Sequence, residues 1–332
     1  MDIADLLALS VSQGASDLHL SAGVAPMLRV DGEMQQCGLP VFGPDQVRGL
    51  IHSLMTDAQR SAFETGHEAD FSCALAGLGR FRVNAFEQQR GAGAVLRSIA
   101  QRVPSLESLG PGEVFRQLCR LPHGLILVTG ATGSGKSTTL AAMIDHLNRS
   151  RQQHILTIED PIEFIHQPAR CLINQREVHR DTHSFSAALR SALREDPDVI
   201  MLGEMRDLET IRLALTAAET GHLVLATLHT SSAARTIDRM VDVFPAEEKA
   251  MVRSMLSESL QAVISQTLVK KVGGGRVAAH EIMLATPAIR NLIRENKVAQ
   301  MVSAIQTGGA VGMQTLEMSL GRLSEARVIE TL

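Results

Sequence analysis

The 332-residue chain has no tryptophan and no tyrosine, and its only aromatic rings besides histidine are nine phenylalanines. It also has only five lysines, and its formal net charge is −4 at pH 7. Residues 1–110 carry 12 acidic and 8 basic side chains, a net of −4, so the remainder is neutral and no basic half is hidden. Nucleic-acid-binding domains combine basic clusters with aromatic stacking platforms. We therefore expect no nucleic-acid partner.

Paired cysteines and membrane spans are missing as well. The four cysteines stand far apart in the sequence, at Cys37, Cys73, Cys119 and Cys171. Without a C-x-x-C pair they predict isolated reduced thiols and no zinc module. No apolar run approaches the 18 residues of a membrane helix, and the acidic residues Asp2 and Asp5 do not suit a signal peptide. These features predict a cytoplasmic protein without a direct membrane span.

The length favours two domains. Residues 1–100 mix helical spacing with strand alternation, which predicts an α+β domain. Residues 101–112, QRVPSLESLGPG, hold two prolines and two glycines and are interpreted as a linker. The expected elements of the first domain are helices at 2–13 and 47–54 and strands at 16–20, 27–30, 79–87 and 94–99, with a turn at Asp31-Gly32.

In residues 113–332, buried apolar runs alternate with helical stretches, which predicts an α/β domain with a mostly parallel sheet covered on both faces. The runs are Leu125–Val128, Ile155–Ile158, Val199–Leu202 and Leu223–Ala226. Apolar residues then recur every three or four positions from Pro245 to Leu268, which predicts one long helix ended by Gly273–Gly275. Thr286-Pro287 is a typical helix start.

The segment Gly130–Thr138, GATGSGKST, follows the first of these runs and precedes a helix, as a phosphate-binding loop requires. Its glycines let backbone N–H groups turn toward a phosphate chain, and the positive end of the next helix adds to the attraction. Lys136 is expected on the β- and γ-phosphates, and the Ser137 hydroxyl on Mg²⁺. The candidate nucleotide-binding residues here are Gly133, Ser134, Gly135, Lys136, Ser137 and Thr138.

Two acidic segments also follow apolar runs. Thr157–Glu163 places three carboxylates at a strand end, where one can orient or deprotonate an attacking water; the alternative is a solvated acidic turn. Asp196–Asp207 delivers Glu204 after a strand, in the arrangement of a Walker-B acid acting on Mg²⁺ or its water shell. The alternative there is an ordinary strand and a charged loop.

The segment Thr220–Thr230 puts a histidine at each end of a buried run. His229 stands at the carboxyl end, where ligands collect in parallel sheets, and is the better candidate for sensing the γ-phosphate. For His222 a structural and a functional role remain equally open.

Together with Ala288–Glu295, AIRNLIRE, these motifs resemble the secretion and type IV pilus ATPase family, specifically its PilT-type retraction (twitching motility) ATPases. The resemblance covers nearly the whole chain, and AIRNLIRE matches the motif of the retraction motors without a change. Ala131 departs from the proline of many relatives, and the C-terminal end is somewhat short for the family. Neither departure removes a catalytic position.

The resemblance implies a PAS-like N-terminal domain, a RecA-like P-loop domain and a homohexameric ring that binds ATP and Mg²⁺ between the two domains. It implies Glu163 as the general base, Glu204 as the Walker-B acid and His229 as the γ-phosphate sensor. It also implies that an arginine of Arg80, Arg82 and Arg97 contacts the nucleotide, and we expect Arg82 above the others. Arg80 and Arg82 should share one face of a strand and Phe81 and Val83 the other.

The implied activity is ATP hydrolysis that powers pilus retraction by pilin disassembly. The implied partners are an inner-membrane platform protein and a paralogous retraction ATPase, at the cytoplasmic side of the pilus machine. The coupling residues would be Ala288, Ile289, Arg290, Asn291, Leu292, Ile293, Arg294 and Glu295. In this segment Ile289, Leu292 and Ile293 can pack as an apolar stripe, which would leave Arg290, Arg294 and Glu295 available for contacts. The alternatives are an accessory retraction ATPase and a nucleotide-gated scaffold that regulates a partner motor.

Overall fold

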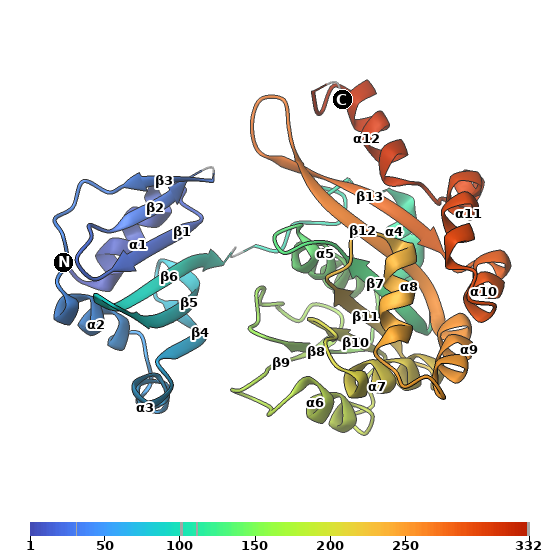
Figure 1. Cartoon of the computed structure of the whole chain (residues 1–332), viewed down its shortest axis with the longest axis horizontal. Coiled ribbons are helices and arrows are strands. Elements are labelled where there is room, and N and C mark those ends of the chain that lie inside the picture. The colour runs from blue at the N-terminus through green and yellow to red at the C-terminus, as the bar shows by residue number, and fades with distance from the viewer. Residues whose placement is uncertain (31, 100–101, 111, 331–332) are drawn as a thin grey trace. The chain divides into compact units, whose positions relative to one another are not determined.

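The computed structural model describes residues 1–30, 32–99, 102–110 and 112–330. The chain divides into two compact units, Met1–Arg102 and Val103–Leu332 (Figure 1). Residues 103–110 were expected to be part of the linker but belong to the second unit, where Leu106 is buried in a core cluster. Gln101, Pro111 and the expected turn residue Asp31 lie outside the described residues.

The first unit is a mixed α+β structure. Its described strands form one antiparallel sheet in the order β3-β2-β1-β6-β5-β4. Its helices are α1 (Ile3–Ser12), α2 (Pro44–His52) and α3 (Asp57–Gly66). Its strands are β1 (Asp17–Ser21), β2 (Met27–Val30), β3 (Glu33–Gln36), β4 (Glu68–Leu75), β5 (Gly79–Gln88) and β6 (Gly91–Ile99).

Local chemistry explains the elements that the sequence predicts here. Helix α1 begins with a reciprocal capping box, in which Asp2 and Asp5 each accept a hydrogen bond from the other's backbone N–H, at 2.9 and 3.1 Å. Strand β5 alternates as expected, since Phe81 and Val83 are buried in the core while Arg80 and Arg82 point to the other face. The predictions of α1 and β5 are therefore confirmed.

The second unit is built on a sheet in the order β13-β12-β7-β11-β10-β8-β9, in which all pairs among the described strands are parallel except β12 with β13. Its strands are β7 (Gly124–Thr129), β8 (His154–Glu159), β9 (Leu172–Glu177), β10 (Val199–Leu202), β11 (Leu223–Leu228), β12 (Leu260–Lys270) and β13 (Arg276–Leu284). Its α-helices are α4 (Glu113–Cys119), α5 (Lys136–Ser150), α6 (Phe185–Ala192), α7 (Leu208–Glu219), α8 (Ala233–Asp242), α9 (Lys249–Ser259), α10 (Pro287–Arg294), α11 (Met301–Thr307) and α12 (Leu316–Glu325).

Both faces of this sheet are buried. Leu125 and Leu127 of β7 point into a core formed with helices α6 to α11, whereas Ile126 and Val128 point into a second core formed with α4 and α5. A central strand that packs on both faces has no polar positions, which is why its sequence is a continuous apolar run. The four predicted strands β7, β8, β10 and β11 and the mostly parallel sheet are confirmed.

The predicted long helix from Pro245 to Leu268 is wrong. Helix α9 ends at Ser259, and Leu260 begins β12, which pairs with β7 on one side and β13 on the other. A strand that is buried on both faces is apolar at nearly every position, so it also has apolar residues three and four positions apart. The spacing therefore cannot distinguish such a strand from a helix. Met251, one of the apolar residues in this predicted helix, is 49% exposed.

Candidate nucleotide-binding site

The candidate motifs gather because they follow parallel strands. Gly130 follows β7, Asp160 follows β8, Gly203 follows β10 and His229 follows β11. Parallel strands end at the same edge of a sheet, and these four are neighbours in the order β7-β11-β10-β8. The phosphate-binding loop, the two acidic segments and His229 are therefore brought together at one carboxyl edge.

The loop Gly130–Gly135 has the shape of a phosphate cradle. Gly133 and Gly135 have φ angles of +78° and +87°, which favour glycine. Apart from Gly133 itself and its two chain neighbours, no described residue has an atom within 4 Å of a Cβ added at Gly133. The Ser134 hydroxyl is buried and has no hydrogen-bond partner among the described residues. An open glycine beside an unsatisfied hydroxyl, at the N-terminus of the 15-residue helix α5, fits a bound phosphate chain.

Lys136 lies at the centre of this edge. Its Nζ donates hydrogen bonds to the carbonyl oxygens of Gly130 and Ala131, at 2.9 and 3.0 Å, and lies 3.5 Å from Nδ1 of His229. Burial lowers the pKa of Lys136, and the negative charges of Glu163 and Glu204 act in the opposite direction. Both predicted catalytic carboxylates therefore lie within electrostatic range of the P-loop lysine.

Glu204 connects to the histidine segment. One of its carboxylate oxygens lies 3.1 Å from Nε2 of His229, and the other forms an ion pair with Arg206. The sequence motif singled out the acid and the histidine but not Arg206. Arg206 follows Glu204 by only two residues, so its place beside this acid was visible in the sequence.

The acidic segment after β8 contains two different kinds of carboxylate. Glu163, the predicted base, is partly exposed, whereas Glu159 is buried and accepts hydrogen bonds from the Thr157 hydroxyl at 2.7 Å and from Gln175 at 3.2 Å. Burial raises the pKa of Glu159 to about 7, against those hydrogen bonds and one from the Glu163 backbone. The two carboxylates therefore stand in different environments, one buried and one partly exposed.

Strand β9 holds the rest of this segment, a role that the sequence analysis missed. The Gln175 amide donates to the Phe164 carbonyl at 2.8 Å and accepts from the His166 N–H at 2.8 Å. Glu177 accepts from the Ile162 N–H at 3.1 Å. The position of Glu163 is therefore set by side chains from a neighbouring strand.

His222 and Arg82, two further candidates from the sequence, each have a partner within their own unit. His222 precedes β11, at the opposite end of that strand from His229, and its Nδ1 lies 3.0 Å from the Ala217 carbonyl oxygen at the end of α7. Within this chain it is not brought to the P-loop. Arg82, on the first unit, forms a two-pronged contact with Asp70, with distances of 3.1 and 2.6 Å.

Helix α10 contains the AIRNLIRE segment except for its last residue, Glu295, which is the C-cap. Thr286 caps it and Pro287 is its first residue, as predicted. Ile289 and Ile293 are fully buried and Leu292 packs beside them, so the predicted apolar stripe is confirmed.

The expectation that Arg290 remains available for a partner is wrong. Its guanidinium donates to the carbonyl oxygens of Ser257 and Glu258, the latter at 2.8 Å, where α9 ends. The last carbonyls of a helix have no partner within the helix, and a cation there also favours the helix dipole. Arg290 therefore caps α9, while the exposed side chains of α10 and its C-cap include Ala288, Asn291, Arg294 and Glu295.

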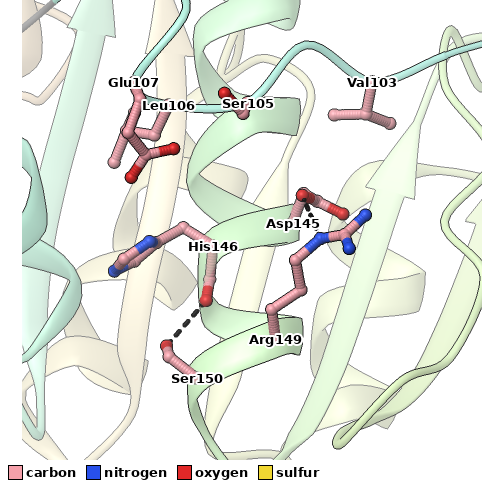
Figure 2. A pocket seen from close by; sticks show the side chains of 8 residues that line it. All are labelled: Val103, Ser105, Leu106, Glu107, Asp145, His146, Arg149 and Ser150. Atoms are coloured by element: carbon pink, nitrogen blue, oxygen red, sulfur yellow. Dashed lines mark hydrogen bonds and ion pairs between the residues drawn. The ribbon is translucent and has the colours of Figure 1, made fainter.

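A separate cavity of about 520 Å³ lies between residues 103–107 and the second half of α5 (Figure 2). It contains the ion pair of Arg149 with Asp145, at 2.7 Å. At about 1.5 Å per helical residue, Asp145 lies about 14 Å along α5 from Lys136. None of the predicted nucleotide-binding residues lines this cavity.

The oxygen-bearing side chains at this sheet edge suit a magnesium ion that is held mainly by phosphates and water. Among residues 1–30, 32–99, 102–110 and 112–330, no group of three or more His, Cys, Asp and Glu side chains could hold a metal ion. Mg²⁺ seldom uses such cages and binds through one or two protein oxygens plus phosphate, which Ser137 and Glu204 can supply. Over the same described residues, no helix has both the length and the apolar character to cross a membrane.

The fold and the edge that carries the site define a P-loop ATPase with a RecA-like core. The family model for type II/IV secretion system proteins matches residues 2–274. The chain belongs to this family.

Individual relatives support the same family assignment. The type IV pilus retraction ATPase PilT of Pseudomonas aeruginosa is 71% identical over 320 residues, covering 96% of this chain and 93% of that protein. A twitching motility protein of Neisseria gonorrhoeae is 58% identical, over 97% of this chain and 86% of that protein. A crystal structure of the pilus retraction motor PilT with bound ADP superimposes with a TM-score of 0.91 at 47% identity, covering 100% of this chain and 95% of that one. The predicted resemblance to retraction ATPases is confirmed.

Proposed function

We propose that this chain is an ATP-hydrolysing motor that powers type IV pilus retraction by pilin disassembly and so drives twitching motility. The observation that carries the proposal is the meeting of Lys136, Glu204 and His229 at one sheet edge beside an open phosphate cradle. The identity of 71% to a pilus retraction ATPase, over 96% of this chain, supplies the biological setting.

In this proposal, backbone N–H groups of the P-loop and Lys136 bind the β- and γ-phosphates of ATP. Ser137 and Glu204 hold Mg²⁺, which when bound neutralises charge on those phosphates. Glu163 orients the attacking water and accepts its proton, and His229 donates a hydrogen bond toward the γ-phosphate. Catalysis then consists mostly of positioning and charge neutralisation, with little covalent work for the protein.

The partners follow from the resemblance. We propose a homohexamer that acts on an inner-membrane platform protein from the cytoplasmic side of the pilus machine. Arg82 is proposed as a further nucleotide contact, on the strength of the resemblance alone. A paralogous ATPase is a proposed second partner, since the type IV pilus ATPase PilU of Pseudomonas aeruginosa is 43% identical over 97% of this chain and 85% of that protein.

The coupling role is proposed for the exposed face of α10. Ala288, Asn291, Arg294 and Glu295 lie on that face, and the buried stripe of the same helix fixes its orientation against the core. A helix that is anchored by one face can present the other to a partner without losing its shape.

Deletion of the gene in the source organism tests the function directly. We expect excess surface pili and lost twitching, rescued by the wild-type gene but not by Glu204→Ala. Loss of pili would indicate an assembly motor instead, and full rescue by Glu204→Ala would indicate a scaffold that does not need hydrolysis. Steady-state ATPase of the purified chain separates the last case, because a scaffold with an intact P-loop would show no turnover.

A further inference from the structure

Gln266 of β12 lies beside the point where β7 ends and the phosphate-binding loop begins. Strand β12 pairs with β7 up to Ser265 opposite Thr129. Gln266 is the next residue of β12, and Gly130 is the residue that follows β7. The side chain of Gln266 is only 2% exposed. A buried primary amide requires partners for both its donor and its acceptor.

Both ends of this amide contact the nucleotide-binding segment. Nε2 of Gln266 donates to the Ser134 carbonyl oxygen at 2.6 Å, and Oε1 accepts from the Thr139 hydroxyl at 2.7 Å. Ser134 lies in the loop and Thr139 in the first turn of α5. One side chain therefore ties the loop and the start of its helix to a strand that lies 132 residues away in sequence.

The loop glycines divide into two groups around this residue. A Cβ at Gly130 would lie 2.3 Å from the backbone carbonyl oxygen of Gln266, and one at Gly135 would lie 2.8 Å from its Nε2. Gly133, by contrast, has open space at the same position. Gly130 and Gly135 are thus needed for close packing against Gln266, and Gly133 leaves room for a ligand.

The contact also fixes the direction of a key donor. In a trans peptide the C=O of Ser134 and the N–H of Gly135 point in opposite directions. When Gln266 holds the Ser134 carbonyl on the strand side, the Gly135 N–H is turned toward the interior of the loop. A cradle of inward N–H groups is what binds phosphate.

We propose that Gln266 is a positioning residue that holds the phosphate-binding loop in its nucleotide-receiving shape before nucleotide arrives. The inference rests on the proposed ATPase function. Without Gln266, the binding of nucleotide must itself order the loop, so the affinity for nucleotide falls. Saturating ATP restores turnover.

The test compares Gln266→Met, which removes both contacts without adding charge, with Gln266→Glu, which removes only the donor to Ser134. Gln261→Glu is the matched control, because Gln261 lies on the same strand and its amide contacts the His123 carbonyl at the other end of β7. Each full-length variant is titrated with a fluorescent ADP analogue and assayed for steady-state ATPase.

We expect Kd for the ADP analogue and KM for ATP to rise about tenfold in both Gln266 variants, which corresponds to about 1.4 kcal/mol, with kcat nearly unchanged. Gln261→Glu should match the wild type.

Binding by Gln266→Met that equals wild type would overturn the inference. If a Gln266 variant fails to fold, Thr139→Val decides, since it removes one hydroxyl and must still weaken binding relative to Gln261→Glu. A wild-type chain that binds no ADP analogue would instead overturn the proposed function.

Discussion

The buried carboxyl of Glu159 should make the stability of the second unit depend on pH. Burial raises the pKa of Glu159 from an ordinary value of 4.5 to about 7. The folded chain therefore keeps a proton that the unfolded chain releases, so this group lowers the free energy of unfolding as pH rises from about 4.5 to about 7. At about 1.4 kcal/mol per pH unit, the loss is about 3 kcal/mol above pH 7.

The variant Glu159→Gln isolates this effect, because glutamine has the same size and keeps an acceptor for Thr157 and Gln175 but cannot ionise. Urea unfolding of both chains at pH 5 and pH 8 gives the difference in unfolding free energy at each pH. We expect the difference to shift in favour of the variant by about 2–3 kcal/mol between pH 5 and pH 8.

Glu219→Gln, at the exposed end of α7, controls for the loss of one negative charge. A difference between Glu159→Gln and wild type that stays constant from pH 5 to pH 8 would refute the reasoning. So would an equal pH effect in Glu219→Gln, since burial would then not be its cause.

Three further outcomes are expected. Glu163→Gln should bind a fluorescent ADP analogue like wild type but lower kcat by about 100-fold or more; near-normal turnover would exclude Glu163 as the base. Arg82→Ala should lower ATPase turnover by about tenfold or more, and an unchanged rate would return Arg82 to a role within the first unit. Arg290→Met should cost about 2 kcal/mol by leaving the α9 carbonyls uncapped, which lowers Tm by about 4–8 °C in calorimetry. Arg294→Met is its control, with contacts of only 3.4 Å, and an equal loss there would contradict the capping role.

The sequence predicts the site well where function depends on local order along the chain. A phosphate-binding loop needs a strand before it and a helix after it, and β7 and α5 supply both. Because β8, β10 and β11 are parallel neighbours, acids and a histidine that directly follow them must meet at one edge. The apolar runs, together with the residues that follow each run, were therefore sufficient to predict this part of the site.

The parts that sequence could not predict depend on contacts between distant segments. Nothing local distinguishes Glu159 from Glu163, since their difference comes from Gln175 and from burial beneath the sheet edge. The sequence predicts Arg290 to be an exposed residue of an amphipathic helix. Its role as the C-terminal cap of α9 depends on where α9 lies in the fold.

The strand order has a consequence for how the protein is made. Strand β7 is the first strand of the second unit to be synthesised, yet its sheet neighbours are β11 and β12, which begin at Leu223 and Leu260. Contacts of such long sequence separation form slowly, because the intervening chain must be ordered first. On the ribosome, the P-loop sequence therefore emerges well before the strands that shape it. A nascent chain that stops between β11 and β12 would contain the complete GATGSGKST motif and still lack the support that Gln266 gives it.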